Sequence, residues 1–346
     1  MIAVQQRPAL PAIARANLPY GVVMATGGAS QLAHVCGLPT ASDLLLGLAI
    51  IQAFWVLLIG MRHHRHQLIQ LSAVRLAVNP PEQHAGALTV PLGLAVIEAG
   101  LATRFGAYTL SLITAAGLIF IWLTAALYIS RFVIALCITP WRLYAVDGAW
   151  FLAPAVLFGI AIATAAALPP TGGGQRWLMA SLAGMTTIAA MAGYWAVLLV
   201  SCLRLIQYRL AGTARAPWWI AMGCAGLAAA ALARVLQIHA VPWLAVLHNP
   251  LQASMVIMYA AALMLLIPIV GFSIDFIWRH CRFRKRASWP PTFSTAVFAM
   301  GGLGLDATLH SAAGATLGMT AAWATLVLWT ISTTWDVWVS ARQVAY

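Results

Sequence analysis

A few ionisable side chains interrupt the long apolar stretches of this sequence, and their spacing is regular. His34, Arg104 and Arg234 each lie 13 to 17 residues after a proline near the start of such a stretch, and Asp306 lies 16 residues after Pro290. In helices that rise about 1.5 Å per residue, these side chains would share one layer. A layer rich in Arg and His attracts anions and replaces part of their hydration shell. The spacing therefore predicts an anion-attracting mouth.

The sequence leaves other interpretations of the two arginines open. Their long side chains could lie along apolar surface and reach lipid headgroups. They could instead pair with Asp306 as a structural bridge, which would leave Arg104 the freer cation. Each interpretation accounts for costly ionisable groups at membrane depth.

Glu98 is a different kind of candidate, because it lies seven residues after Pro91 and therefore near mid-membrane. An ionised carboxylate there would repel anions in a pore. Burial could keep the carboxyl group protonated, or it could face Arg234 or another helix. If Glu98 titrates, proton-linked transport becomes an alternative to passive anion flow.

The composition indicates which environment the chain occupies. Of its 346 residues, 62% are hydrophobic and 8% are charged, and the mean hydropathy is +0.89. So much apolar surface cannot be hidden from water, so we expect an integral membrane protein. The formal net charge of +12 would suggest nucleic acid in a soluble chain. Here the cations flank apolar runs, so we expect lipid contact and no nucleic-acid partner.

Metal and disulfide chemistry have little support. The five cysteines lack CxxC spacing, which argues against a disulfide framework or a zinc site. The tract RHHRH at 62–66 could bind a metal through its imidazoles. Its arginines oppose cation binding, and a basic loop that meets anionic lipid explains the tract as well. We expect no metal and no cofactor.

Ten stretches are long enough to cross about 30 Å of hydrocarbon as helices. They cover 18–37, 42–61, 86–104, 108–136, 149–168, 177–203, 217–238, 250–278, 289–308 and 312–340. An even number of spans places both termini on one side, and all cations except Arg104, Arg176 and Arg234 fall on that side. This bias predicts cytoplasmic termini in the cell's plasma (inner) membrane. We expect a tail at 1–17, a ten-helix domain at 18–341 and a second tail at 342–346.

Prolines recur near the predicted start of each odd-numbered span, at Pro19, Pro91, Pro154, Pro217 and the pair Pro290 and Pro291. Their separations of 63 to 73 residues indicate five copies of one helical hairpin. Proline bends a helix, and irregular backbone survives in a membrane only against protein or around water. We therefore expect an all-α fold, with an inner ring of bent odd-numbered helices around a central pore and an outer ring of even-numbered helices.

The odd-numbered spans also carry short motifs. These are YGVVMATGGAS at 20–30, TVPLGLAVI at 89–97, AWFLAPAVLFGIAIA at 149–163, PWWIAMGCAGLAAAAL at 217–232 and WPPTFSTAVFA at 289–299. In order and topology they resemble the tellurite-resistance/dicarboxylate transporter family, which includes plant slow-type anion channels, bacterial tellurite-resistance channels, and yeast malate and sulfite carriers. Ser294 stands where the family has a proline, and Cys224 and Ala225 stand where it often has prolines. The bends could therefore be displaced.

The resemblance implies a ten-helix pore protein, often a homotrimer with one pore per subunit, that passes small inorganic anions, oxyanions or dicarboxylates. In the family a phenylalanine of the ninth helix closes the pore, and Phe293 matches it; simple packing is the alternative role. We also expect pore-lining residues at prolines and hydroxyls of the odd spans. These are Pro91, Pro154, Pro217, Thr26, Thr89, Thr292, Ser294 and Thr295.

Two other functions compete with a gated anion channel. A proton-coupled C4-dicarboxylate or sulfite carrier is the first, with Glu98 as the proton-linked group. A membrane oxidoreductase is less favoured, because it needs two opposed histidines to ligate haem. Its candidates are His34, His239, His248 and His310. The leading prediction is a transport protein that is not an enzyme; chloride, nitrate, malate, sulfite and tellurite all stay open as its anion.

Overall fold

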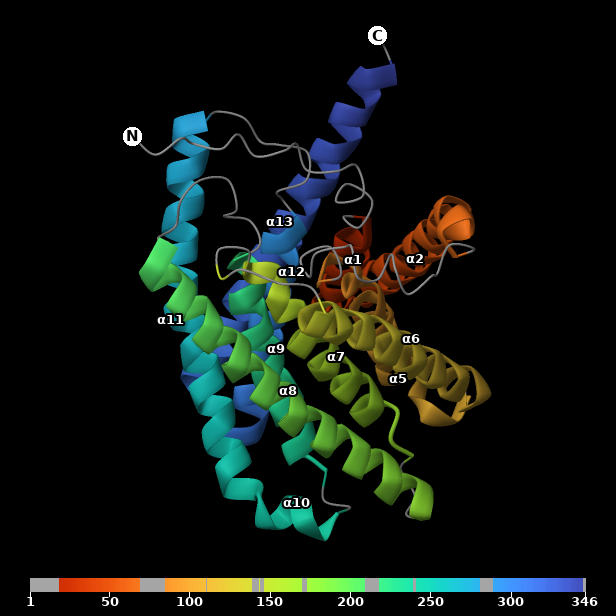
Figure 1. The fold of residues 1–346 in the computed structure, drawn as a ribbon. Coiled ribbons are helices and arrows are strands. Elements are labelled where there is room, and N and C mark those ends of the chain that lie inside the picture. Colours follow the sequence, from red (N-terminus) through yellow and green to blue (C-terminus); the bar gives the residue numbers. More distant parts are fainter. Residues whose placement is uncertain are drawn as a thin grey trace.

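Every regular element in the described part of the chain is a helix (Figure 1). The computed structural model describes residues 19–68, 85–109, 111–138, 143, 146–169, 173–208, 218–238, 241–280 and 289–344. Its helices are α1 (Pro19–Val35), α2 (Pro39–Leu68), α5 (Thr89–Thr109), α6 (Ser111–Ile138), α7 (Leu152–Ala166), α8 (Gly174–Tyr208), α9 (Trp218–Leu236), α10 (Pro242–Val246), α11 (His248–His280), α12 (Trp289–Leu309) and α13 (Ala312–Val344). A short 3-10 helix, Gly148–Phe151, leads into α7. The predicted all-helical fold is confirmed.

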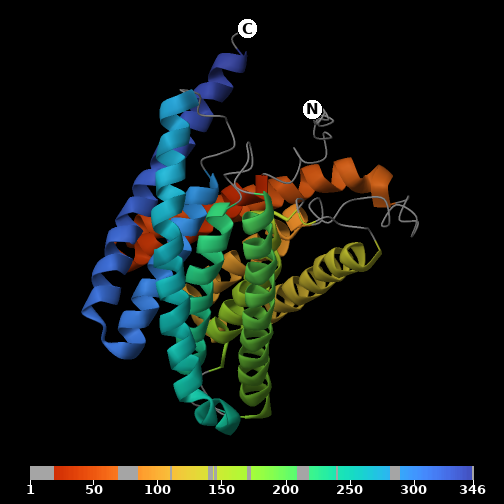
Figure 2. The same ribbon diagram turned by 60° about the vertical axis from the view of Figure 1, so that its left-hand side comes forward.

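Eight of these helices are long and apolar enough to cross a membrane, which makes the chain a multi-pass membrane protein. They are α2, α5, α6, α7, α8, α9, α11 and α13. The short helix α10 was not expected from the sequence. It lies at the turn between α9 and α11, at the foot of the bundle in Figure 2.

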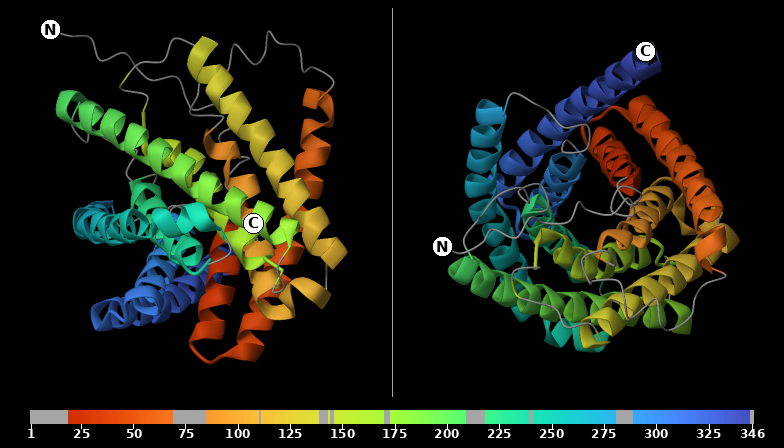
Figure 3. Two further views of the ribbon diagram at one scale, coloured as in Figure 1. Left: turned by 90° about the horizontal axis from the view of Figure 1, so that it is seen from below. Right: turned by 45° about the horizontal axis from the view of Figure 1, so that its top comes forward.

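Five helices form a closed ring. α1 contacts α5, α5 contacts α7, α7 contacts α9, α9 contacts α12, and α12 returns to α1. Each of these five helices also packs against the next long helix in the chain, which lies outside the ring. The pairs are α1 with α2, α5 with α6, α7 with α8, α9 with α11, and α12 with α13. Figure 3 shows the two layers from further directions. We call α1, α5, α7, α9 and α12 the inner helices and the other five long helices the outer helices.

Burial separates the two layers. In an apolar 18-residue stretch of each membrane-spanning helix, the share that is buried inside the protein is 67% in α5, 72% in α7 and 89% in α9. The corresponding share in the outer helices is 17% to 28%. The exposed outer faces carry large apolar side chains such as Phe54, Leu199 and Met264. Backbone groups of a helix are satisfied internally, so such faces suit lipid contact.

Small residues allow the inner helices to approach closely, as is usual in membrane proteins. A Cβ atom on Gly223 of α9 would lie 2.7 Å from the Ser294 Oγ of α12, and one on Gly304 of α12 would lie 2.7 Å from the Ala233 Cβ. The Ser294 hydroxyl donates a hydrogen bond of 2.7 Å to the Trp219 carbonyl. The glycines of these spans therefore serve helix packing.

The prolines mark helix starts. Pro91 and Pro154 are the third residues of α5 and α7, and Pro290 and Pro291 are the second and third of α12. In the first turn the missing N–H has no intrahelical acceptor to lose, so proline is tolerated there. These prolines therefore lie in the first turn and not in the interior of α5, α7 and α12, and the bending of the inner helices stays a prediction. Pro217 lies outside the described residues.

Candidate functional site

A cavity of about 220 Å³ lies within the inner ring, lined by residues from all five inner helices. Its lining comes from the later turns of each helix, such as Leu32 and Val35 on α1 and Ala230 and Ala233 on α9. Its polar side chains are Gln31, His34, Thr103, Arg104, Arg234 and Gln237. Two arginines in a small cavity give it a positive electrostatic character.

Three residues of the predicted mouth line this single cavity. They are His34 on α1, Arg104 on α5 and Arg234 on α9. Asp306, the fourth member of the predicted layer, precedes the lining residue Ala307 on α12. Similar distances from the helix starts therefore bring His34, Arg104 and Arg234 to one cavity.

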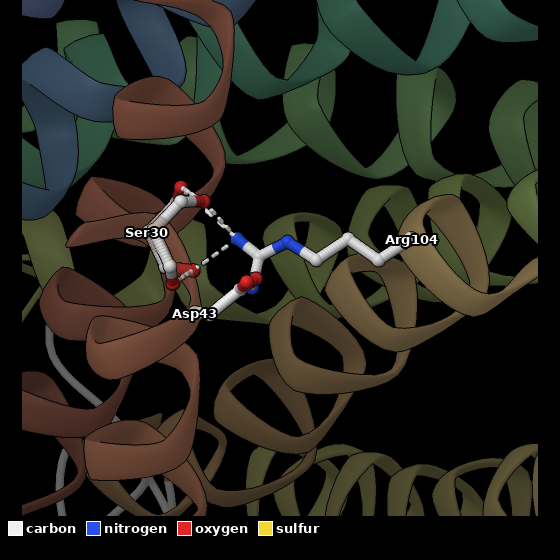
Figure 4. Close-up of polar contacts among 4 residues, drawn as sticks. Ser30, Asp43 and Arg104 are labelled. Atoms are coloured by element: carbon white, nitrogen blue, oxygen red, sulfur yellow. Dashed lines mark hydrogen bonds and ion pairs between the residues drawn. The ribbon is translucent and has the colours of Figure 1, made fainter. Parts of the chain in front are cut away.

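Arg104 has a different partner from the one considered in the sequence. Its Nη1 atom lies 3.3 Å from Oδ1 of Asp43, near the start of α2 (Figure 4). The interpretation that Arg104 is the freer cation is corrected by this ion pair. Residues 43 and 104 lie far apart in the sequence, and the close packing of α1, α2 and α5 brings them together.

The other end of the Arg104 guanidinium is held by two serines. Nη2 donates to the Ser30 carbonyl at 3.2 Å, to the Ser30 hydroxyl at 2.6 Å and to the Ser42 hydroxyl. The Ser30 hydroxyl donates to the Ser42 carbonyl at 2.9 Å, and the Ser42 hydroxyl donates to the Ser30 carbonyl at 2.6 Å. Both serines are fully buried. This network joins the α1–α2 hairpin to α5 beside the cavity.

Phe293 lies on the face of α12 that lines the cavity, two turns before it. Met300, Leu303, Gly304 and Ala307 line the cavity and recur at the spacing of one helical face. Phe293 precedes Met300 by seven residues, about two turns, and so projects toward the same side. Its side chain is 4% exposed. Phe293 therefore lies on the same helical face of α12 as the cavity-lining residues, about two turns nearer the start of the helix.

Phe298 faces a different direction. Its ring stacks on Tyr259 of α11 with centroids 4.9 Å apart and an interplanar angle of 18°. Phe298 thus packs toward an outer helix and forms a natural comparison for Phe293.

The predicted pore-lining hydroxyls make contacts between or within helices. Trp329 Nε1 of α13 donates to Thr26 Oγ1 at 3.1 Å, and the Thr292 and Ser332 hydroxyls lie 3.5 Å apart. Thr89 and Thr295 donate to carbonyls of their own segments. None of these hydroxyls, and neither Pro91 nor Pro154, is among the residues that line the cavity. Their role in a pore stays a prediction.

Glu98 points away from the cavity. It is buried on α5, and a Cβ atom on Gly117 of α6 would lie 2.5 Å from Glu98 Oε2. Among the described residues Oε1 has no hydrogen-bond partner. The absence of a side chain at Gly117 leaves room for this carboxyl group between an inner and an outer helix.

The histidines considered as haem ligands lie on different elements of the described structure. His34 lines the cavity, His248 begins α11, and His310 lies between α12 and α13 with a φ of 51°. His239 and the side chains of 62–66 lie outside the described residues. No group of three or more His, Cys, Asp or Glu side chains in the described part of the chain could hold a metal ion.

The residues that sequence reasoning missed are Ser30, Ser42 and Asp43, together with the cavity glutamines Gln31 and Gln237. A polar cluster at the turn between two apolar runs was the available signal, in the segment PTASD at 39–43. In comparisons with known proteins, no family model matches the chain and no curated protein matches its sequence.

Proposed function

We propose that this chain is a membrane anion channel or transporter, related to the tellurite-resistance/dicarboxylate transporter family. The observation that carries the proposal is the cavity that all five inner helices line, with Arg104, Arg234 and His34 in its wall. Positive groups in a narrow, partly apolar pathway raise the local anion concentration. They bind weakly enough to let the ion move on.

In this proposal the ten long helices cross the membrane as five hairpins, and the inner ring surrounds the pathway. The closed contacts of the ring and its high burial support the arrangement. The bias of the cations supports cytoplasmic termini in the plasma (inner) membrane. A homotrimer with one pathway per subunit follows from the family resemblance alone. No enzymatic step is part of the proposal.

Phe293 is the proposed gate. It is buried, it lies on the lumen side of α12, and it is two turns from the polar cavity. An aromatic ring at that position blocks ions because an apolar constriction excludes hydrated ions. The family resemblance assigns the same role to the matching residue.

Flux of a small anion through reconstituted protein tests the proposal. Proteoliposomes that hold wild type, Phe293→Ala or Phe298→Ala are compared for nitrate and chloride flux, with potassium flux as the selectivity control. We expect Phe293→Ala to raise anion flux by roughly an order of magnitude. Phe298→Ala removes a ring of the same size from the outer face and leaves flux at the wild-type level. Equal flux in all three proteins, or equal passage of potassium, contradicts a Phe293-gated anion pathway.

A proton-coupled carrier of dicarboxylates or sulfite is the second candidate, and the buried carboxyl group of Glu98 favours it. Ionisable groups inside a membrane span are costly and often functional. Uptake of labelled malate or sulfite driven by an imposed proton gradient distinguishes the two candidates. Proton-driven uptake that is lost in Glu98→Gln supports the carrier. Anion flux that does not depend on the proton gradient supports the channel.

A further inference from the structure

The two ends of the Arg104 guanidinium have different surroundings, and the difference has a functional meaning. Nη2 is held by three oxygen atoms of Ser30 and Ser42. Nη1 makes no hydrogen bond among the described residues and faces the Asp43 carboxylate at 3.3 Å. The serines therefore orient the arginine without help from Asp43.

Asp43 and Arg104 also differ in exposure. The Arg104 side chain is 7% exposed and that of Asp43 is 67% exposed. An ion pair with a well-hydrated partner is weak, because water screens the carboxylate and ordering it has an entropic cost. A charge-assisted hydrogen bond to an oxyanion held in a cavity is stronger. Nη1 is itself buried, so an anion in the cavity gains this donor only by displacing the Asp43 carboxylate.

We propose that Asp43 is a tethered counter-ion that competes with the transported anion for Arg104 and so lowers the affinity of the cavity for anions. The inference rests on the proposed function of anion transport. When the cavity is empty, the carboxylate neutralises a cation that would otherwise be buried without a partner, which is unfavourable. When an anion enters, it replaces the carboxylate at Nη1, while the serines keep the guanidinium in place. A site that releases its anion readily is what conduction requires.

The test measures how nitrate flux saturates in proteoliposomes. The variants are Asp43→Asn, Asp43→Ser and the charge-preserving Asp43→Glu, each in the Phe293→Ala background so that the gate does not limit flux. Asp306→Asn removes the same charge at the residue before the cavity-lining Ala307 and serves as the matched control. Arg104→Gln, alone and combined with Asp43→Asn, shows whether the effect passes through the arginine.

We expect the two neutral variants to lower the half-saturating nitrate concentration by about two- to fivefold, the range that exposed ion pairs support. Asp43→Glu keeps the starting value, and Asp43→Asn has no further effect once Arg104 is glutamine. A half-saturating concentration that is unchanged or higher in both neutral variants overturns the inference. So does an equal decrease in Asp306→Asn, since that result points to general charge instead of a specific pair.

A binding measurement separates this inference from the proposed function. Nitrate that binds the folded protein raises its thermal unfolding midpoint. We expect a larger rise in Asp43→Asn than in wild type and no rise in Arg104→Gln. If Phe293→Ala carries no anion but this pattern holds, transport is refuted while the competition stands. If flux is present but the rise is the same in Asp43→Asn and wild type, the competition is refuted and the transport function stands.

Discussion

Gly226 of α9 and Phe298 of α12 lie backbone to backbone, since a Cβ atom on Gly226 would come within 2.9 Å of both the Cα and N atoms of Phe298. Real Cβ atoms do not approach a neighbouring backbone so closely. The two inner helices, α9 and the helix α12 that carries Phe293, are therefore held at a separation that glycine alone permits.

Gly226→Ala should therefore weaken the fold. The added methyl group meets backbone that cannot move aside, and overpacking of this kind destabilises proteins by about 1–3 kcal/mol. Gly47→Ala is the control, because nothing lies within 4 Å of a Cβ atom at that position of α2. Thermal unfolding in detergent should show a lower midpoint for Gly226→Ala and an unchanged or slightly higher one for Gly47→Ala. Equal midpoints would contradict the close approach.

Trp329→Phe should lower stability by a small amount. The change removes the donor that bonds Thr26 across α1 and α13, and interhelical hydrogen bonds in membrane proteins contribute about 0.6 kcal/mol on average. Trp323→Phe is the same substitution at a residue of the same helix that is 48% exposed. We expect a lower unfolding midpoint for Trp329→Phe than for Trp323→Phe. The reverse order would place the important contact elsewhere on α13.

The start of α12 is tied to α13 by a charged hydrogen bond. Trp289 Nε1 donates to Asp336 Oδ2 at 2.8 Å, four residues before Phe293. Bonds to charged groups contribute about 1.5–3 kcal/mol to stability. In a double-mutant cycle, Trp289→Phe and Asp336→Asn should each lower the free energy of unfolding, and the double variant should lose less than their sum. Simple additivity would show that the two side chains act independently.

Glu98→Gln should leave passive nitrate flux at the wild-type level, because the carboxyl group faces Gly117 and is not among the cavity residues. Gly117→Val should reduce the yield of folded protein, since its Cβ atom would meet Glu98 Oε2 at 2.5 Å. Flux and size-exclusion profiles of both variants check the two expectations. A large loss of flux in well-folded Glu98→Gln would give this carboxyl group a part in the pathway.

The helices could be predicted well from the sequence, because an apolar run of about 20 residues has few alternatives in a membrane. The expected spans 289–308 and 217–238 agree with α12 (Trp289–Leu309) and α9 (Trp218–Leu236) within a few residues. The level shared by His34, Arg104 and Arg234 was also predictable, since the inner helices start near prolines and rise at the same rate.

Side-chain direction was less predictable. Ser294 bonds the Trp219 carbonyl, and Thr26 accepts a bond from Trp329, because neighbouring helices supply their partners. Residue type alone suggested a pore lining for both. The Asp43–Arg104 pair was missed for the same reason, since the contact arises only when the α1–α2 hairpin packs against α5. The roles of Phe293 and of the cavity residues stay predictions.

The closure of the inner ring has a consequence for biosynthesis. α1 contacts α5 and α12, and Thr26 bonds a tryptophan 303 positions further along the chain. During translation α1 is therefore made long before α12 and α13, and its contacts with them can form only when those two helices have been synthesised. Until then the small residues of α1 that face α12 have no partner. Gly28 is one of them, and it packs against Ala296 in the finished ring. Such long-range contacts form slowly, and multi-part proteins commonly misassemble at this stage. The last hairpin is thus the step at which assembly is completed, and ribosome-released fragments that end before α12 should be the ones that quality-control proteases remove.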